Sequence, residues 1–133
     1  MKSFMNRERV VIDTNVIVSA LYSPKGMAYS FLIGALDGKY EVVLTESIYS
    51  EYLRVLHKPK FSFDEETIEG VLGGLQSHAL WIEVNEQDYP AAMTDLTDVP
   101  FYVAARATGA RLVTGNIRHY PVEEWRTMLW EMQ

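Results

Sequence analysis

Short runs of hydrophobic residues alternate along the chain with longer segments of helical periodicity. The runs resemble strands buried on both faces and cover residues 10–13, 40–45, 79–84 and 110–115. Strands that alternate with helices predict a parallel sheet with right-handed crossovers and helices on both faces. The pattern therefore predicts an α/β fold, a three-layer α/β/α sandwich with a doubly wound central parallel sheet.

Two helices have clear predicted boundaries. Residues 27–36 form an apolar helical segment that ends at an Asp-Gly pair. Thr45 is expected to cap a second helix, which runs through Leu56 and stops before a proline. These signals are local, so the boundaries are predicted without knowledge of the tertiary contacts.

The remaining helices are less regular. A helix is predicted from Asp64 to Ala79, although two adjacent glycines within it cost about 1 kcal/mol each, so packing is expected to hold it. Another begins with Asp98 as its N-cap and closes at Gly109. The tail after Pro121 is predicted to be helical, and no late edge strand can be identified in it.

Composition limits the classes of protein to consider. The 133 residues are expected to form a single domain, 1–133, and they contain no cysteine, which excludes disulfides and thiolate metal sites. The first nine residues lack the apolar core of a secretory signal, and no later stretch reaches the roughly 20 apolar residues that span a bilayer. We therefore expect a cytoplasmic protein with no membrane association.

The net charge of −6 argues against a broad basic surface that coats nucleic acid. Positive charge is nevertheless clustered locally, at Lys58 and Lys60 and again at Arg118 and His119. Each of these side chains taken singly is most simply a solvated surface group. As clusters they are candidates for binding a substrate's phosphates. For His119, a loop or substrate contact is favoured over a role as general base.

Asp13 interrupts an otherwise apolar segment. It follows the hydrophobic residues 10–12 directly, and a second apolar run, 16–18, begins three residues later. A carboxylate in such a position is tolerated when it is paired, hydrogen-bonded or bound to a metal. Asp13 therefore needs partners from elsewhere in the chain.

Open α/β sheets place functional residues beyond the carboxyl ends of their strands. If the first and last predicted strands are central neighbours, Asp13, Glu51, Asp98 and Asn116 can project into one pocket. Simpler explanations exist for most of them: Asp98 as an N-cap, Glu51 as a solvent-facing acid, and Asp95 and Asn116 as turn residues. Asp13 is the hardest to explain in this way.

Crowded carboxylates repel one another unless a cation compensates their charge. Oxygen ligands select hard ions, so Mg²⁺ or Mn²⁺ is expected rather than Zn²⁺. Such an ion supplies a nucleophilic water and neutralises charge on a phosphodiester under attack. An acidic pocket near scattered basic groups therefore predicts a phosphodiester substrate.

Four stretches together resemble the PIN-domain family, and within it the toxin-like, VapC-type members. They are VVIDTNVIVSAL, VVLTESIYSEYLRVLHKPKF, TDLTDVPFYVAARATGA and RLVTGNIRHYP. The resemblance implies a metal-dependent ribonuclease with the sheet described above. For toxin members it implies an endoribonuclease that is a homodimer, acts on RNA and is blocked by a cognate antitoxin protein.

The resemblance also implies a role for individual residues. Asp13, Glu51 and Asp98 would be the metal ligands and, with Asn116, the catalytic residues. Asn116 stands where many members have a fourth acid, so one or two ions are implied. The tail after Pro121 departs from members that finish with another strand and helix. The residues expected to support the site are Asn15, Asp95 and Thr114.

Two rival functions remain open. The first is a catalytically weak PIN-like module that only binds RNA or protein, which the amide of Asn116 and the acidic net charge favour slightly. The second is a receiver domain or an aspartate-nucleophile phosphatase, because both use an aspartate after the first strand. Against this second rival, such a phosphatase has a second aspartate where this chain has Asn15. A receiver would need a lysine where residues 114–116 are Thr-Gly-Asn.

Overall fold

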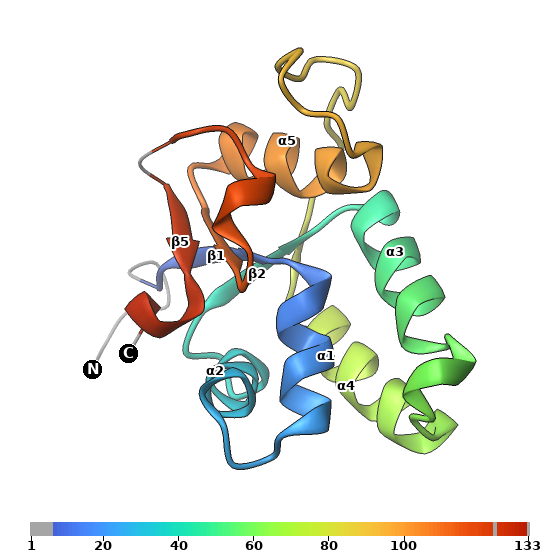
Figure 1. The fold of residues 1–133 in the computed structure, drawn as a ribbon. Helices are drawn as coiled ribbons and strands as arrows, with labels where there is room; N and C mark the ends of the chain where they lie inside the picture. The colour runs from blue at the N-terminus through green and yellow to red at the C-terminus, as the bar shows by residue number, and fades with distance from the viewer. Residues whose placement is uncertain (1–6, 124, 133) are drawn as a thin grey trace.

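The computed structural model describes residues 7–123 and 125–132. In this part of the chain, five parallel strands form one sheet in the order β3-β2-β1-β4-β5. The prediction of a parallel sheet is therefore confirmed (Figure 1). The strands are β1 (Arg9–Ile12), β2 (Glu41–Leu44), β3 (Leu80–Trp81), β4 (Arg111–Thr114) and β5 (Arg126–Met128).

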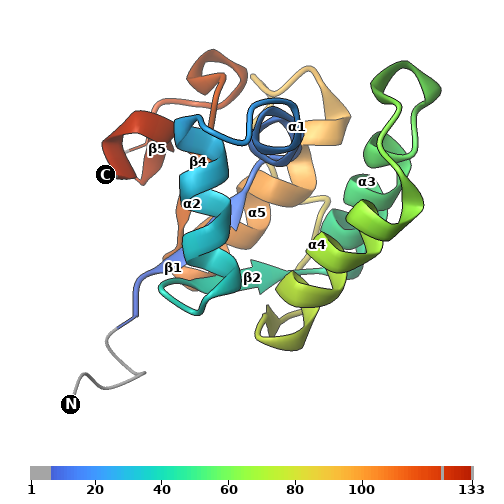
Figure 2. The ribbon, with the colours of Figure 1, turned by 90° about the horizontal axis from the view of Figure 1, so that it is seen from below.

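Helices cover both faces of the sheet, as the predicted three-layer sandwich requires. Helix α5 lies above the sheet in Figure 1, whereas α1, α2 and α4 lie below it, and α3 packs against both α1 and α5. Figure 2, seen from below, shows α1 and α2 in front of the strands. The α-helices are α1 (Thr14–Tyr22), α2 (Met27–Leu36), α3 (Glu46–Leu56), α4 (Glu65–Ser77) and α5 (Val99–Thr108).

The central position of β1 brings distant parts of the chain together. It pairs with β2 on one side and with β4 on the other. The chain therefore adds β2 and β3 to one side of β1 and then crosses over to add β4 and β5 to the other side. Residues Val10–Ile12 are fully buried, as expected for a strand covered on both faces. The carboxyl ends of β1 and β4 are therefore neighbours, at the place where open α/β sheets hold their sites.

Most predicted helix boundaries are confirmed. Helix α2 spans the predicted residues, and the Thr45 hydroxyl accepts the Ile48 N–H at 3.1 Å, which caps α3. Asp64 caps α4 in the same way. Helix α4 ends at Ser77, slightly before the predicted Ala79.

Close packing explains one of the two glycines in α4. A Cβ at Gly74 would lie 2.7 Å from the Leu36 Cδ2, so this glycine lets α4 approach the end of α2. A Cβ at Gly73 would meet nothing within 4 Å. The packing expected to hold this helix is provided by its buried residues Ile68, Leu72 and Leu75.

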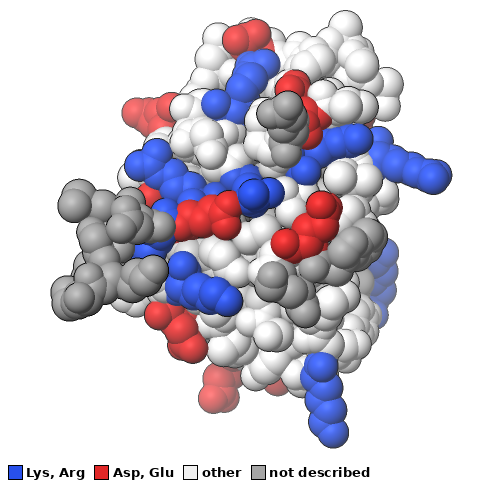
Figure 3. All heavy atoms as spheres, turned by 90° about the vertical axis from the view of Figure 1, so that its left-hand side faces the viewer, with Lys and Arg blue, Asp and Glu red and all other residues white. Residues whose placement is uncertain are grey.

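Charges of both signs are interleaved on the face beside β5, which Figure 3 shows. Arg9 pairs with Glu41 at 2.7 Å, and Arg111 pairs with Glu8. Both arginines are therefore engaged by acids from other segments of the chain. Within the described residues, no single helix is long and apolar enough to cross a membrane. The helices α1 and α2 would reach the length only together, and they are bent by 111°.

The carboxyl-terminal tail differs from the prediction. Instead of a helix it forms strand β5, which pairs with β4, and then the 3₁₀ helix η5 (Leu129–Met132). The predicted strand at 79–84 is also shorter than expected, since only Leu80–Trp81 pair with β2. Both segments lie at sheet edges, where pairing with one neighbour rather than a long apolar run defines the strand.

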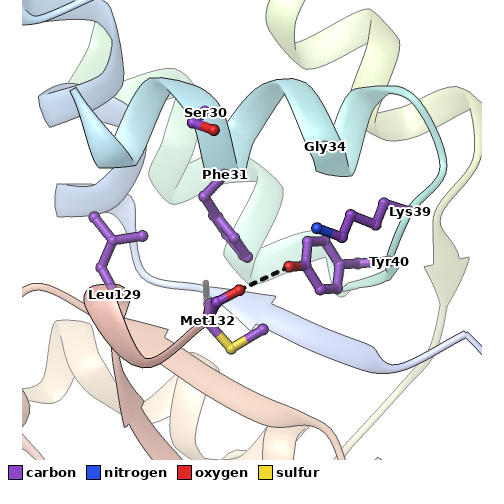
Figure 4. Close-up of a pocket in the computed structure, with 7 residues that line it drawn as sticks. All are labelled: Ser30, Phe31, Gly34, Lys39, Tyr40, Leu129 and Met132. Atoms are coloured by element: carbon purple, nitrogen blue, oxygen red, sulfur yellow. Dashed lines mark hydrogen bonds between the residues drawn. The ribbon is translucent and has the colours of Figure 1, made fainter. Parts of the chain in front are cut away.

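Helix η5 packs beside α2 around a cavity of about 270 Å³ (Figure 4). Phe31 and Tyr40 point toward η5 there, and the Tyr40 hydroxyl donates to the Met132 carbonyl at 3.2 Å. The tail is thus part of the packed structure, and this cavity contains none of the carboxylates predicted to bind metal.

Candidate functional site

Asp13 is the centre of the candidate site. It follows β1, its N–H donates to the Val113 carbonyl of β4 at 2.9 Å, and only 6% of the residue is exposed. Three side-chain donors converge on its Oδ2 atom: the Thr114 hydroxyl at 2.8 Å, the Tyr120 hydroxyl at 2.9 Å and the Asn15 amide at 3.3 Å. The partners that the sequence required for this carboxylate are therefore present.

Asn15 and Thr114 also hold the loop after β4 against Asp13. The Asn15 Oδ1 accepts the Gly115 N–H at 3.0 Å, and the Thr114 hydroxyl accepts the Asn116 N–H at 2.9 Å. Each side chain thus contacts Asp13 with one group and the loop with another. The structure gives both residues the contacts expected of supporting residues.

Asp98 lies at the start of α5 and is also buried, with 8% of the residue exposed. It was predicted to cap this helix, but its side chain makes no capping hydrogen bond. Its Oδ2 instead faces the His119 Nδ1 at 3.5 Å, and the His119 Nε2 lies 2.7 Å from the Asn116 amide nitrogen. His119 and Asn116 therefore belong to one polar cluster with Asp98.

Burial perturbs both aspartates, and repulsion by neighbouring acids adds to its effect at Asp98. Desolvation is the largest of the effects that raise the pKa of Asp98 to about 6; the charges of Asp13, Asp95 and Glu51 add to it, and the charge of His119 opposes it. Desolvation also raises the pKa of Asp13, although hydrogen bonds from Thr114 and Tyr120 oppose this effect. Two buried carboxylates with raised pKa values favour a proton or a cation between them.

Glu51 is paired with an arginine of its own helix. The Arg54 guanidinium binds both of its oxygens, at 3.1 and 2.7 Å. The two residues line a groove of about 510 Å³ between α3 and the segment that leads into α5. The role of Glu51 as a metal ligand stays a prediction, which requires the carboxylate to leave Arg54.

Several other predicted residues lie outside the cluster. The Asp95 side chain accepts the Thr97 N–H and hydroxyl at the start of the 3₁₀ helix η3 (Leu96–Asp98), and the Asp95 carbonyl accepts the Asp98 N–H at 3.1 Å. Asp95 is therefore a turn residue, and its charge also raises the pKa of Asp98. Arg118 is exposed on η4 (Ile117–His119). Lys58 and Lys60 follow the carboxyl end of α3. Because this helix is roughly 16 Å long at 1.5 Å per residue, the two lysines lie at about that distance from its first turn.

Two tyrosines that the sequence did not connect with Asp13 complete its environment. Tyr120 donates to Asp13, and the fully buried Tyr52 of α3 donates to the Ile12 carbonyl at 2.6 Å. Burial and the charge of Asp13 raise the pKa of both hydroxyls, so both act as donors at neutral pH. The only sequence signal for Tyr120 is its position shortly after β4, next to a proline.

The residues present fit a hydrated hard ion better than a fully coordinated one. In residues 7–123 and 125–132, no group of three or more histidine or acidic side chains is close enough to hold a metal. The charge of Asp13 does raise the pKa of Asp98, and the buried hydroxyl of Thr14, which follows Asp13, has no hydrogen-bond partner among the described atoms. Mg²⁺ typically uses one or two carboxylates and keeps several waters, which suits this arrangement.

Comparison with protein families supports the same interpretation. Residues 9–118 match the model of the PIN domain, from the start of β1 into η4. No curated protein and no solved structure matches the chain. PIN domains are generally nucleases and typically use divalent metal ions. Because the match covers most of the chain and the fold agrees with it, this protein belongs to the PIN-domain family.

Proposed function

We propose that this protein is a Mg²⁺- or Mn²⁺-dependent endoribonuclease. The observation that carries the proposal is the pair formed by Asp13 and Asp98, two buried carboxylates whose pKa values are both raised. Asp13 and Asp98 would hold the ion, and Glu51 would join them after it leaves Arg54. The bound ion would supply an activated water and stabilise charge on the phosphodiester.

The chain's own residues prepare the site for this chemistry. Thr114, Tyr120 and Asn15 all donate to one oxygen of Asp13, which fixes the orientation of the carboxylate. Asn116 and Asp98 hold His119 from its two ring nitrogens, at the exposed edge of the site. His119 and Arg118 are therefore available to contact the phosphates of an RNA strand.

The biological role that we propose is that of a toxin in a toxin–antitoxin pair. It rests on the resemblance of four sequence stretches to toxin-like PIN proteins, and it includes a cognate antitoxin protein and a homodimer. The test is expression in a host cell without any antitoxin: the parent chain, produced alone, should arrest growth of the host. The Asp13→Asn variant, produced in equal amounts, should not. Growth unaffected by the parent protein would contradict the toxin role while leaving the nuclease proposal open.

The nuclease itself is tested with purified protein. The parent should cleave single-stranded RNA with Mn²⁺ and not with EDTA, and Asp13→Asn should lose both cleavage and Mn²⁺ binding. Asp88→Asn is the matched control, because Asp88 is an exposed acid that pairs with Arg106. It should cleave at the parent rate. Cleavage by Asp13→Asn as fast as by the parent would refute the assignment of Asp13.

A second candidate function is a PIN-like module that binds RNA or protein without cleaving. The ion pair between Glu51 and Arg54 favours it, as does Asn116 in place of a fourth acid. A Mg²⁺ titration followed by intrinsic fluorescence separates the two functions. The nuclease should show a saturable response in the millimolar range, and the binding module should show none.

A further inference from the structure

Three aromatic side chains, from the end of α1 and from the turn after α3, form a cluster. These two segments lie toward the lower end of the molecule in Figure 1, whereas α5 lies at its upper end. The Tyr22 ring, at the end of α1, packs edge-on against Phe61 at 5.7 Å and Phe63 at 5.3 Å between centroids. The two Phe rings stack on each other at 5.5 Å with an interplanar angle of 13°. Tyr22 remains 56% exposed, so a large part of this ring faces solvent.

The backbone is strained where it presents the two Phe rings. Ser62, which separates them, has φ of 56°, a left-handed conformation that residues other than glycine adopt at a cost. Its N–H and its hydroxyl both bond to the Pro59 carbonyl, which closes the turn. The turn places Phe61 and Phe63 on the same side, so the strain has the effect of building one aromatic surface.

Positive charge accompanies these rings. The Lys60 Nζ lies over the Phe61 ring at 5.1 Å from its centroid, and Lys58 precedes it in the same turn. The nearest acids in sequence have other partners, since Asp64 caps α4 and Glu65 pairs with His57 at 2.7 Å. Neither of these two acids therefore forms an ion pair with the lysines beside the rings.

An exposed aromatic ring beside lysines is the kind of arrangement by which proteins bind single strands: a base stacks on the ring and the cations contact phosphates. Tyr22 supplies the exposed ring here, and the half-buried Phe61 and Phe63 support it. We propose that Tyr22, Phe61 and Phe63, with Lys58 and Lys60, form a stacking platform for single-stranded RNA. This inference rests on the proposed function and assigns part of the substrate site. Helix α1 separates Tyr22 from the Asp13 end by about 13 Å at 1.5 Å per residue. One strand can therefore reach both places.

The test measures binding without cleavage. A fluorescein-labelled oligouridine of roughly a dozen nucleotides, within the span of single-strand sites, is titrated with protein in EDTA and followed by anisotropy. Tyr22→Ala should weaken binding by between about fivefold and about 150-fold. This range corresponds to the loss of one stacked base, because stacking is worth about 1–3 kcal/mol and each tenfold change in affinity corresponds to about 1.4 kcal/mol. Tyr22→Phe should restore binding. In Lys60→Gln, the negative slope of the logarithm of the binding constant against the logarithm of the salt concentration should become shallower by about 0.7, because one phosphate contact is lost.

The matched control is Trp81→Ala, which removes an exposed aromatic side chain from the edge strand β3. It should bind like the parent. Equal affinity of Tyr22→Ala and the parent, or an equal loss in Trp81→Ala, would overturn the platform. So would a change of oligomeric state in Tyr22→Ala, measured by light scattering, because the rings would then contact a second copy. A protein that binds in this pattern but never cleaves RNA would refute the nuclease and leave the platform standing.

Discussion

Replacing Asp98 with asparagine should stabilise the protein at neutral pH when no divalent ion is present. The ordinary pKa of this carboxyl is 3.8 and its pKa in the folded protein is about 6. Each unit of difference is worth about 1.36 kcal/mol, so the ionised carboxylate costs the fold about 3 kcal/mol. The amide keeps the shape of the side chain and removes the charge that faces Asp13.

The pH dependence follows from the direction of this difference. Because the pKa of Asp98 is higher in the folded protein, folding favours the protonated form. Its contribution to stability is complete below pH 3.8 and is lost as the pH rises through about 6. The parent should therefore lose stability relative to Asp98→Asn between about pH 4 and pH 7.

The assay is urea unfolding of the parent and Asp98→Asn at several pH values in EDTA, followed by fluorescence. The variant should be more stable by up to about 3 kcal/mol at pH 7.5 and nearly equal to the parent near pH 4. Adding Mn²⁺ should stabilise the parent and narrow the gap. Asp88→Asn controls for removal of an exposed acid. A variant that is less stable at pH 7.5, or a gap that does not change with pH, would refute the crowding of the carboxylates.

Three further predictions concern single side chains. Tyr120→Phe removes a buried donor to a carboxylate and should lower the unfolding free energy by about 2 kcal/mol at pH 7.5, measured by urea unfolding; an unchanged value would contradict the hydrogen bond. Gly73→Ala should stabilise α4 by about 1 kcal/mol, whereas Gly74→Ala should stabilise it less because its methyl group would meet Leu36 of α2. Thermal unfolding compares the two variants, and an equal gain in stability would contradict the packing of Gly74 against α2. Arg54→Ala releases Glu51 and should lower the Mn²⁺ concentration for half-saturation severalfold in a fluorescence titration; an unchanged midpoint would show that Glu51 is not a ligand.

The elements predicted correctly are those whose signals are local. The boundaries of α2 and α3 follow from an Asp-Gly pair directly after α2 and from the cap at Thr45 directly before α3. The apolar runs predicted β1 and β4 as strands, but their pairing was only a condition of the predicted pocket, which the structure fulfils. The burial of Asp13 was also predicted, since a strand end between apolar segments lies in the interior.

The errors share one cause, which is pairing between distant segments. Strand β5 is short, and its hydrogen bonds with β4 define it more than its own composition does. Its Arg126 donates to the carbonyls of Ile117 and Tyr120, both at 2.9 Å, and so holds the loop that brings Tyr120 to Asp13. Because β5 was not predicted, the position of Tyr120 beside Asp13 was not predicted either. Asp98 was taken for a helix cap because the sequence did not show that His119 faces it.

The central claim is that Asp13 and Asp98 crowd each other so closely that they bind a divalent cation. The most direct measurement is a crystal soaked in millimolar Mn²⁺ and recorded for anomalous scattering. We predict a Mn²⁺ peak between Asp13 and Asp98, with Glu51 turned toward it and away from Arg54. A well-ordered site without anomalous density between the two aspartates would contradict the claim.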